Sequence, residues 1–259
     1  MKNGFLASIG RAFLDFLSAS GRLVLFALSA IWFGIRPPYY PRLILRQMVD
    51  IGYYSLPVVG LTAIFTGMVL ALQTYTGFSR FAAENAIANV VVLSVTRELG
   101  PVIGGLMVAG RIGAAIAAEI GTMRVTDQID ALTTLSTNPF RYLVAPRLIA
   151  GLTMLPLLVL VADIIGVFGG FLVSTYKLDF NPASYVQRSI EFLHSDDVIA
   201  GLSKAAVFGF LIALMGCYNG YNSHGGAQGV GAATTYAVVS SSILILVFDY
   251  VLTEAFFAR

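Results

Sequence analysis

Five stretches of the chain are apolar over more than 20 residues, which is the length that an α-helix needs to cross the hydrocarbon core of a bilayer. They cover about 48–74, 86–110, 148–174, 198–221 and 234–257. Hydrophobic residues make up 57% of the chain and charged residues only 12%, about half of the share in a soluble domain. Because no fixed-period repeat or Pro/Ser-rich linker divides the chain, the sequence predicts one all-α integral membrane domain over residues 1–259.

Residues 1–40 have a different pattern, typical of an amphipathic arm. Polar side chains recur at steps of three and four, at Ser8, Arg11, Asp15, Ser18 and Arg22. Apolar side chains occupy the other side, at Leu6, Ile9, Phe13, Phe16 and Leu17. The next apolar run, 23–33, is shorter than a span, and Trp32 and Tyr39 are typical of the headgroup level. We therefore expect an interfacial helix followed by a re-entrant segment that dips into the membrane and returns.

Basic residues in the loops indicate the orientation, because short cytoplasmic loops are enriched in Lys and Arg. With the N-terminus inside, the inner side holds Lys2, Arg11, Arg22, Arg36, Arg42, Arg46, Arg111, Arg124, Arg141 and Arg147. The outer side then holds only Arg80, Lys177, Arg188 and Arg259. The sequence predicts a cytoplasmic N-terminus, a periplasmic C-terminus and an outer, solvated hairpin over 176–197.

Small residues recur every fourth position along the second span, at Gly105, Ala109, Gly113, Ala117 and Gly121. Two more G-x-x-x-G pairs follow in later spans, Gly166 with Gly170 and Gly216 with Gly220. Such stripes let helix backbones approach closely in lipid. They predict tight helix packing, either within one chain or between two copies of it.

Two full charges and a helix breaker lie within the second span, at Arg97, Glu98 and Pro101. Each ionised side chain at the bilayer centre costs on the order of 2.5–3.5 kcal/mol. Adjacent helical residues do not face each other, so Arg97 and Glu98 need partners from other spans. Pro101 has no N–H for the carbonyl of Arg97, and a freed carbonyl beside a charge indicates a hydrated cavity.

Matching depths predict which charges meet. At 1.5 Å per residue, Arg97 and Asp163 fall at nearly the same depth, and so do Lys204 and Asp249. We therefore expect the pairs Arg97–Asp163 and Lys204–Asp249. Two interpretations remain open, namely a polar site in an outward-facing cavity that handles a charged headgroup, and a structural network of buried ion pairs.

The inner loop after the second span contains a short amphipathic helix, expected within 124–138. Thr126 can cap it, and acidic residues in its first turn favour the positive end of the helix dipole. Its apolar side consists of Val125, Ile129, Leu132 and Leu135, and Asn138 with Pro139 ends it after about ten residues. Because Asp127 and Asp130 would meet an anionic leaflet unfavourably, a groove in a cytosolic protein is the better partner.

Three runs of the sequence resemble the MlaE/YrbE permeases of ABC transporters associated with MCE proteins. They are RELGPV in the second span, EIGTMR with DQIDAL and NPFRYLVAPR in the inner loop, and GVGAATTYAVVSSSILILVFDYVLT near the C-terminus. The resemblance implies a homodimeric, non-catalytic permease of the Gram-negative inner membrane, in which ATP and Mg are held by separate MlaF-like ATPase subunits. It also implies a periplasmic MlaD-like MCE hexamer, a small MlaB-like STAS-domain protein, and phospholipid movement between inner and outer membranes that maintains outer-membrane asymmetry.

The same resemblance assigns roles to individual residues. Those that match the coupling motif toward the ATPase are Glu119, Met123, Arg124, Asp127, Gln128, Asp130 and Leu132. Those that match polar positions of a lipid cavity are Arg97, Glu98, Lys204 and Asp249, to which the depth argument adds Asp163. The chain departs from the family at TTLSTNP, which lacks an acid, and at Ala232 and Tyr236, where relatives often carry basic residues. No role is assigned to those positions.

Other classes of function fit the sequence less well. The chain has no G-x-x-x-x-G-K-[ST] run, so no P-loop binds ATP here. His194 and His224 lie in different loops and make no metal site with Cys217, and a net charge of +2 does not indicate nucleic acid. One alternative is a proton-coupled secondary transporter that relays protons through Glu98, Asp163 and Asp249. Another is a membrane enzyme with Asp196 and Asp197 as paired acids. Neither the direction of transport nor the exact cargo follows from the sequence.

Overall fold

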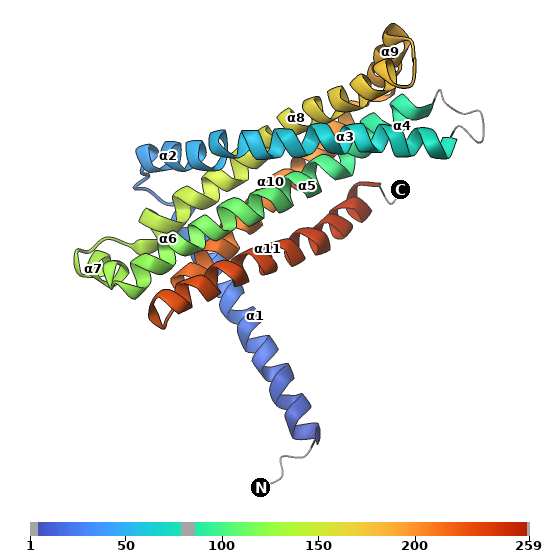
Figure 1. The fold of residues 1–259 in the computed structure, drawn as a ribbon. Coiled ribbons are helices and arrows are strands. Elements are labelled where there is room, and N and C mark those ends of the chain that lie inside the picture. The colour runs from blue at the N-terminus through green and yellow to red at the C-terminus, as the bar shows by residue number, and fades with distance from the viewer. Residues whose placement is uncertain (1–4, 79–85, 258–259) are drawn as a thin grey trace.

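The computed structural model describes residues 5–78 and 86–257, and all regular structure in these ranges is helical (Figure 1). Six helical stretches within them are long and apolar enough to cross a membrane. The predicted class, an all-α integral membrane protein, is confirmed. Lys2, Arg80 and Arg259, which entered the prediction of orientation, lie outside the described residues.

The helices follow one another with short connections. The α-helices are α1 (Phe5–Ile35), α2 (Pro41–Ile51), α3 (Leu56–Phe78), α4 (Ile87–Ser94), α5 (Gly100–Val108), α6 (Ala114–Val125), α7 (Gln128–Thr134), α8 (Ala145–Tyr176), α9 (Pro182–Phe192), α10 (Ser195–Tyr221) and α11 (Gly226–Phe257). A 3₁₀ turn, η1 (Tyr53–Ser55), joins α2 to α3. Three π-helical turns, η4 (Val95–Leu99), η5 (Ala109–Gly113) and η6 (Phe140–Val144), join α4 to α5, α5 to α6 and the inner loop to α8.

Several spans are longer than their apolar cores predicted. The second runs without a break over Ile87–Val125 and the third over Phe140–Tyr176. The predicted end of the second span at Gly110 is therefore too early. The helix continues past Arg111 because side chains below that point, including Ala117 and Ile120, are buried in the bundle. Arg111 itself donates to the hydroxyl oxygen of Ser55 at 2.7 Å and to the carbonyl oxygen of Asp50 at 3.2 Å, so its guanidinium is hydrogen-bonded beside the junction of α2 and α3.

The N-terminal arm forms one unbroken helix, α1, so the expected turn back within this segment is wrong. Its apolar stretch extends over Phe13–Ile35, which is long enough to span and exceeds the short run read from the sequence. Figure 1 shows α1 running away from the other helices rather than alongside them. Among its described side chains, those of its later part anchor it, where the ring of Phe26 lies 5.1 Å from Phe140 and 5.4 Å from Tyr218.

Glycines bring the central helices into backbone contact. A Cβ atom on Gly67 of α3 would lie 1.8 Å from the carbonyl oxygen of Gly166 in α8. A Cβ atom on Gly209 of α10 would lie 2.1 Å from the carbonyl oxygen of Gly151 in α8. These positions admit only glycine, since any side chain there would separate the helices.

The stripes of small residues pack within one chain wherever the structure describes their contacts. Gly216 of α10 lies against Ile116 of α6, and Gly220 lies against Ala117. Gly113 lies near Ile212 of α10. Close packing inside the bundle, one of the two interpretations of the stripes, therefore accounts for these glycines.

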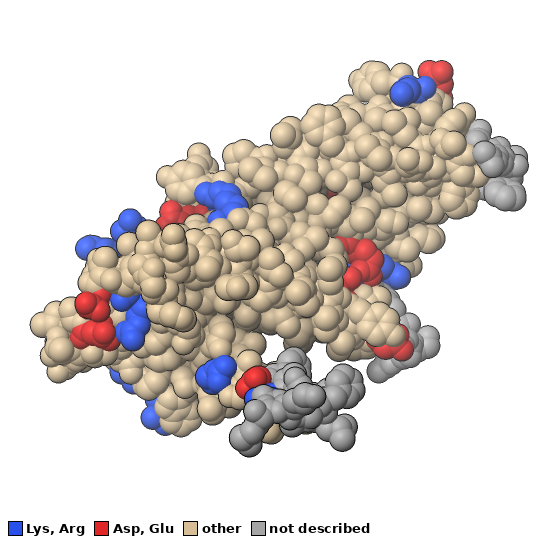
Figure 2. Space-filling model, turned by 60° about the horizontal axis from the view of Figure 1, so that its bottom comes forward, with Lys and Arg blue, Asp and Glu red and all other residues tan. Residues whose placement is uncertain are grey.

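The two ends of the bundle carry most of its charge. Figure 1 shows α7 at one end and α9 at the other, with the C-terminus nearer the α9 end. Figure 2 shows a broad apolar area between charged side chains at the ends, interrupted by a small acidic patch with basic atoms beside it. The outer hairpin is more ordered than a plain connector, since α9 begins after Asn181, whose Oδ1 accepts from the N–H groups of Ala183 and Ser184.

Candidate functional site

Charged side chains from three helical spans meet at one depth. Arg97 and Glu98 lie in the π turn η4, ten and eleven residues after the start of α4. Lys204 lies nine residues after the start of α10, and Asp249 lies eight residues before the end of α11. They are thus roughly 12–17 Å from the outer ends of their helices at 1.5 Å per residue. A π turn adds one residue to a helical turn and re-aims side chains, which is why such turns are frequent at functional sites.

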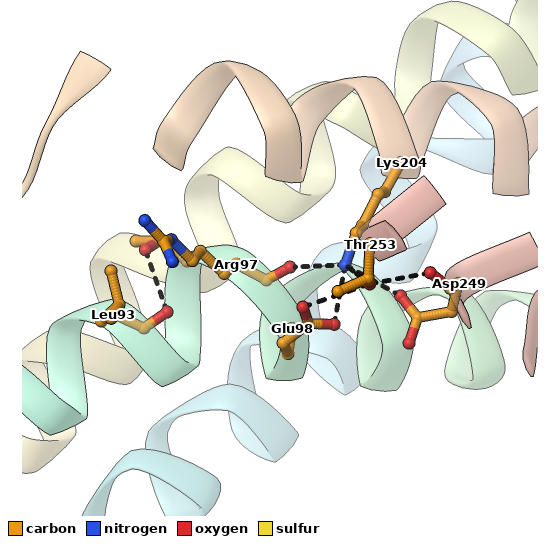
Figure 3. Close-up of polar contacts among 7 residues, drawn as sticks. Leu93, Arg97, Glu98, Lys204, Asp249 and Thr253 are labelled. Carbon is orange, nitrogen blue, oxygen red and sulfur yellow. Dashed lines mark hydrogen bonds and ion pairs between the residues drawn. The ribbon is translucent and has the colours of Figure 1, made fainter. Parts of the chain in front are cut away.

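Lys204 is the centre of this network (Figure 3). Its Nζ donates to Glu98 Oε2 at 2.7 Å, to Thr253 Oγ1 at 2.6 Å and to the carbonyl oxygen of Arg97 at 3.2 Å. Asp249 Oδ1 lies 3.1 Å from Nζ, as an ion pair whose angle falls outside that of a hydrogen bond. The expected meeting of Lys204 with Asp249 is therefore present, and Glu98 joins it. The Lys204 side chain itself is fully buried.

The carbonyl of Arg97 is available to Lys204 because of Pro101. A proline at that position has no N–H to donate to the carbonyl four residues before it. The sequence predicted this freed carbonyl, and the structure places an ammonium group on it. Pro101 therefore frees the carbonyl oxygen to which the buried Lys204 donates.

Arg97 turns away from Lys204 and pairs with Asp197. Its Nε donates to Asp197 Oδ1 at 2.7 Å, and its Nη2 bonds the same oxygen. Asp197 Oδ2 accepts from the backbone N–H of His194 at 3.2 Å, so one buried carboxylate both caps α10 and holds Arg97. The expected pair Arg97–Asp163 is wrong, because α10 begins at Ser195, three residues before the expected start of that span, and its first turn brings Asp197 to Arg97.

Asp163 lies apart from the Lys204 contacts. Its Oδ1 is buried without a hydrogen bond and points at Gly100, where a Cβ atom would come within 1.8 Å of it. The residue also lines an apolar groove of about 270 Å³ between α4, α8, α9 and α10. The structure therefore does not bring Asp163 together with the other four predicted cavity residues.

The inner loop forms the short helix α7, which begins after Asp127 rather than after Thr126. Thr126 Oγ1 donates to the carbonyl of Thr122 at 2.8 Å, and Asp127 takes the left-handed conformation with φ of 57° at the N-cap. The predicted cap at Thr126 is therefore wrong. Ser136, also left-handed at 57°, turns the chain away and leaves seven helical residues instead of about ten.

The predicted coupling residues divide into an exposed group and a packed group. Arg124 donates to Asp130 at 2.8 Å on the exposed side, and Gln128 donates to Thr126 at 3.0 Å. Met123 and Leu132 pack against the hydrophobic core instead of facing outward. The exposed apolar side chain on this part of the chain is Leu135, at 74% exposure, to which the family resemblance gave no role.

Glu119 lies beside a buried arginine. Arg147 Nη2 is 2.7 Å from Glu119 Oε2, and Arg147 Nη1 donates to the carbonyl of Leu143 at 2.6 Å. This pair ties the inner end of α6 to the start of α8, on either side of the loop that contains α7. The Glu119 side chain is therefore partly exposed and at the same time paired with the body of the bundle.

Sequence reasoning missed three members of these networks. Thr253 is four residues after Asp249, and that helical spacing places both on one face. Asp197 follows Ser195 in the first turn of a helix, where acidic side chains favour the dipole. Arg147 was counted only as a loop charge, since nothing in its neighbours reveals that it is buried.

Comparison with known proteins shows the family of this chain. The family described as "Permease MlaE" matches residues 44–255, which include the whole charged network and the inner loop. The chain belongs to the MlaE permease family.

Relatives match this MlaE family chain over most of its length. A protein of Rickettsia felis described as a probable ABC transporter permease is 60% identical over 250 residues, 96% of each chain. A protein of Haemophilus influenzae named intermembrane phospholipid transport system permease protein MlaE is 35% identical over 260 residues, 98% of this chain and 97% of that protein. The Arabidopsis thaliana protein trigalactosyldiacylglycerol 1, chloroplastic, is 38% identical over 213 residues, 82% of this chain and 61% of that protein. The chain is thus a multi-pass ABC transporter permease of the MlaE family.

Proposed function

We propose that this chain is the non-catalytic permease subunit of a transporter in the bacterial inner membrane that moves phospholipids between the inner and outer membranes. In this role it maintains the lipid asymmetry of the outer membrane. The observation that carries the proposal is the partly exposed network of mixed charges about 15 Å inside the bundle. The name of the Haemophilus influenzae relative supports phospholipid as the cargo.

The network has to face something other than acyl chains. Glu98 is 38% exposed and Asp249 is 21% exposed on the surface of a single chain. A charge facing hydrocarbon at that depth costs on the order of 2.5–3.5 kcal/mol. A second copy of the chain closing over this face removes the cost by enclosing a water-filled chamber, and the chamber accepts a lipid headgroup. A homodimer therefore fits the exposed charges better than a single chain in lipid.

The inner end offers a contact for an ATPase. The chain itself has no P-loop, so ATP and Mg belong to a separate MlaF-like subunit. Leu135 and the exposed charges of α7 present a small surface at the end of the bundle opposite α9. Movement of that subunit reaches the network through α6, which continues directly into the span that carries Arg97 and Glu98.

The places proposed for the remaining partners depend on the proposed orientation of the chain. A cytoplasmic N-terminus places α1 along the inner interface, where its exposed apolar side chains meet lipid. The outer ends of the bundle and α9 then face a periplasmic MlaD-like MCE hexamer. A small MlaB-like STAS-domain protein completes the complex on the side of the ATPase.

Reconstitution tests this function. The chain with its ATPase and MCE partners, in donor vesicles facing labelled acceptor vesicles, should move phospholipid only when ATP is supplied. Glu98→Lys should abolish most of the transfer without preventing assembly, because it places a second cation beside Lys204. Asp15→Lys, on the exposed face of α1 and away from both charged networks, is the control charge reversal and should transport normally. Normal transfer by Glu98→Lys, or transfer by the chain alone under a proton gradient, would contradict the proposal.

A further inference from the structure

We infer that the Lys204 network recognises phospholipids whose headgroup carries a primary ammonium, in preference to anionic headgroups. The inference rests on the proposed function, since it names the class of lipid that the same chamber takes. Its basis is a count of donors and acceptors around Lys204. The three N–H donors of Lys204 are bonded within the protein, while the carboxylates of the network keep acceptor positions that no donor of the protein uses.

All three donors of Lys204 have acceptors inside the bundle. An ammonium group has three N–H donors and no acceptor. The three positions are taken by Glu98 Oε2, Thr253 Oγ1 and the carbonyl oxygen of Arg97, at 2.7, 2.6 and 3.2 Å. Because the Lys204 side chain is also fully buried, a phosphate group has no route to it without breaking one of these bonds.

The carboxylates, in contrast, keep unused lone pairs. An ionised carboxylate offers about four acceptor positions. Thr253 has one hydroxyl proton, and its oxygen lies 2.8 Å from the carbonyl of Asp249 but 3.3 Å from Glu98 Oε1. The proton therefore favours the backbone carbonyl, which leaves Glu98 Oε1 with unused acceptor capacity. Asp249 Oδ1 also accepts no hydrogen bond, but it is buried beside Lys204, so a ligand reaches this carboxylate through the part of the side chain that is 21% exposed.

The Lys204 network carries a net negative charge, and its partly exposed side chains are the two carboxylates, Glu98 and Asp249. Lys204 contributes one positive charge, against one negative charge each from Glu98 and Asp249. Arg97 does not offset the difference, because it forms its own pair with Asp197. Figure 3 shows the Arg97 side chain extending away from the carboxylates, with only its carbonyl directed to Lys204. A ligand meeting Glu98 and Asp249 therefore meets one net negative charge and a surplus of acceptors.

A primary ammonium satisfies both requirements, because it brings one positive charge and three N–H donors. Hydrogen bonds between ionised groups are about twice as strong as neutral ones. A quaternary ammonium such as choline has the charge without the donors, and a glycerol headgroup leaves the phosphate charge uncompensated. The network therefore predicts the order phosphatidylethanolamine, phosphatidylcholine, phosphatidylglycerol.

Lipid retention by the purified chain tests this order. The full chain is incubated in mixed micelles that contain equal amounts of the three lipids, repurified, and its bound lipids are measured by mass spectrometry. Phosphatidylethanolamine should be enriched over phosphatidylglycerol relative to the micelle. Glu98→Gln removes the surplus charge and should lower that enrichment roughly tenfold, as the loss of one charge-assisted hydrogen bond implies. Glu191→Gln, which removes an equal charge from α9, should leave the enrichment unchanged.

A second variant and a second reading separate the possible outcomes. Asp249→Asn removes the same charge from α11 and should also lower the enrichment. It replaces Glu98→Gln as the test if that variant fails to fold. Equal retention of the three lipids by the unaltered chain overturns the inference while leaving phospholipid transport in place. Retention of no phospholipid at all counts against the proposed function itself.

Discussion

The ammonium group of Lys204 lies 3.2 Å from the carbonyl oxygen of Arg97, on a different helix 107 residues away. That carbonyl lacks its usual helical donor because Pro101 follows four residues later. The proline thus creates an acceptor inside the membrane, and the lysine of α10 uses it. Two features that are each costly in lipid, a broken helical hydrogen bond and a buried cation, offset each other in this contact.

Removal of the Lys204 ammonium should destabilise the bundle strongly. Lys204→Met leaves Glu98 and Asp249 without their buried counter-ion, and breaking a buried ion pair costs about 3–5 kcal/mol. We expect a lower midpoint of thermal unfolding in detergent. The double variant Lys204→Met with Glu98→Gln should recover part of the loss, because one unpaired charge is then gone. Unchanged unfolding of the single variant would mean that the network is not formed in the membrane.

Asp197 should matter more for stability than its place near a loop implies. Its side chain is only 2% exposed and accepts from both Arg97 and the N-cap of α10. Arg97→Gln leaves this carboxylate buried without its cation, and the expected loss of unfolding free energy is about 3 kcal/mol. The neighbouring acid Asp196 is exposed, so Asp196→Asn is the control and should have little effect.

Gly209 should not tolerate even one added methyl group. A Cβ atom there would come within 2.1 Å of the carbonyl oxygen of Gly151, so Gly209→Ala has to push α10 away from α8. Overpacking of this kind costs about 1–3 kcal/mol, measurable as a lower unfolding midpoint. Gly110 has no atom within 4 Å of its Cβ position, and Gly110→Ala should be neutral or slightly stabilising. Equal effects of the two substitutions would show that the close contact is absent.

Leu135 provides a clean test of coupling to the ATPase. Leu135→Asp places a charge on an exposed apolar site and should abolish co-purification of the ATPase subunit while the permease stays folded. Leu132→Asp is less informative, because Leu132 packs against the core and its replacement also damages the fold. Leu135→Met keeps the apolar surface and should bind normally. Retained binding by Leu135→Asp would remove α7 from the interface.

Hydropathy and length predicted the fold class well, because a membrane admits few alternatives to helices. The pairing of Lys204 with Asp249 was also predictable, since their depths could be counted from the ends of two clearly bounded spans. The freed carbonyl of Arg97 followed from the covalent chemistry of Pro101 alone. These features depend on local rules, which a single sequence carries.

The errors arose where helices extend beyond their apolar cores. The span after the outer hairpin begins at Ser195 rather than at about 198, so Asp197 belongs to its first turn and not to a solvated loop. That difference exchanged Asp163 for Asp197 as the partner of Arg97. The arm α1 was misjudged because its apolar run was read over 23–33 only, whereas the apolar stretch of this helix covers Phe13–Ile35. The π turns have no sequence signal of comparable clarity, and they depend on packing between spans.

The order of residues in the Lys204 network also constrains how the protein is made. Glu98 leaves the ribosome first, Lys204 follows about a hundred residues later, and Asp249 with Thr253 arrives only with α11. Until then the lysine lacks two of its neighbours, so the nascent chain holds an incompletely neutralised cation within the translocon or the bilayer. A polypeptide that stops before α11 therefore keeps Glu98 as the sole carboxylate beside Lys204, whereas the finished one adds Asp249 and Thr253 and completes the set.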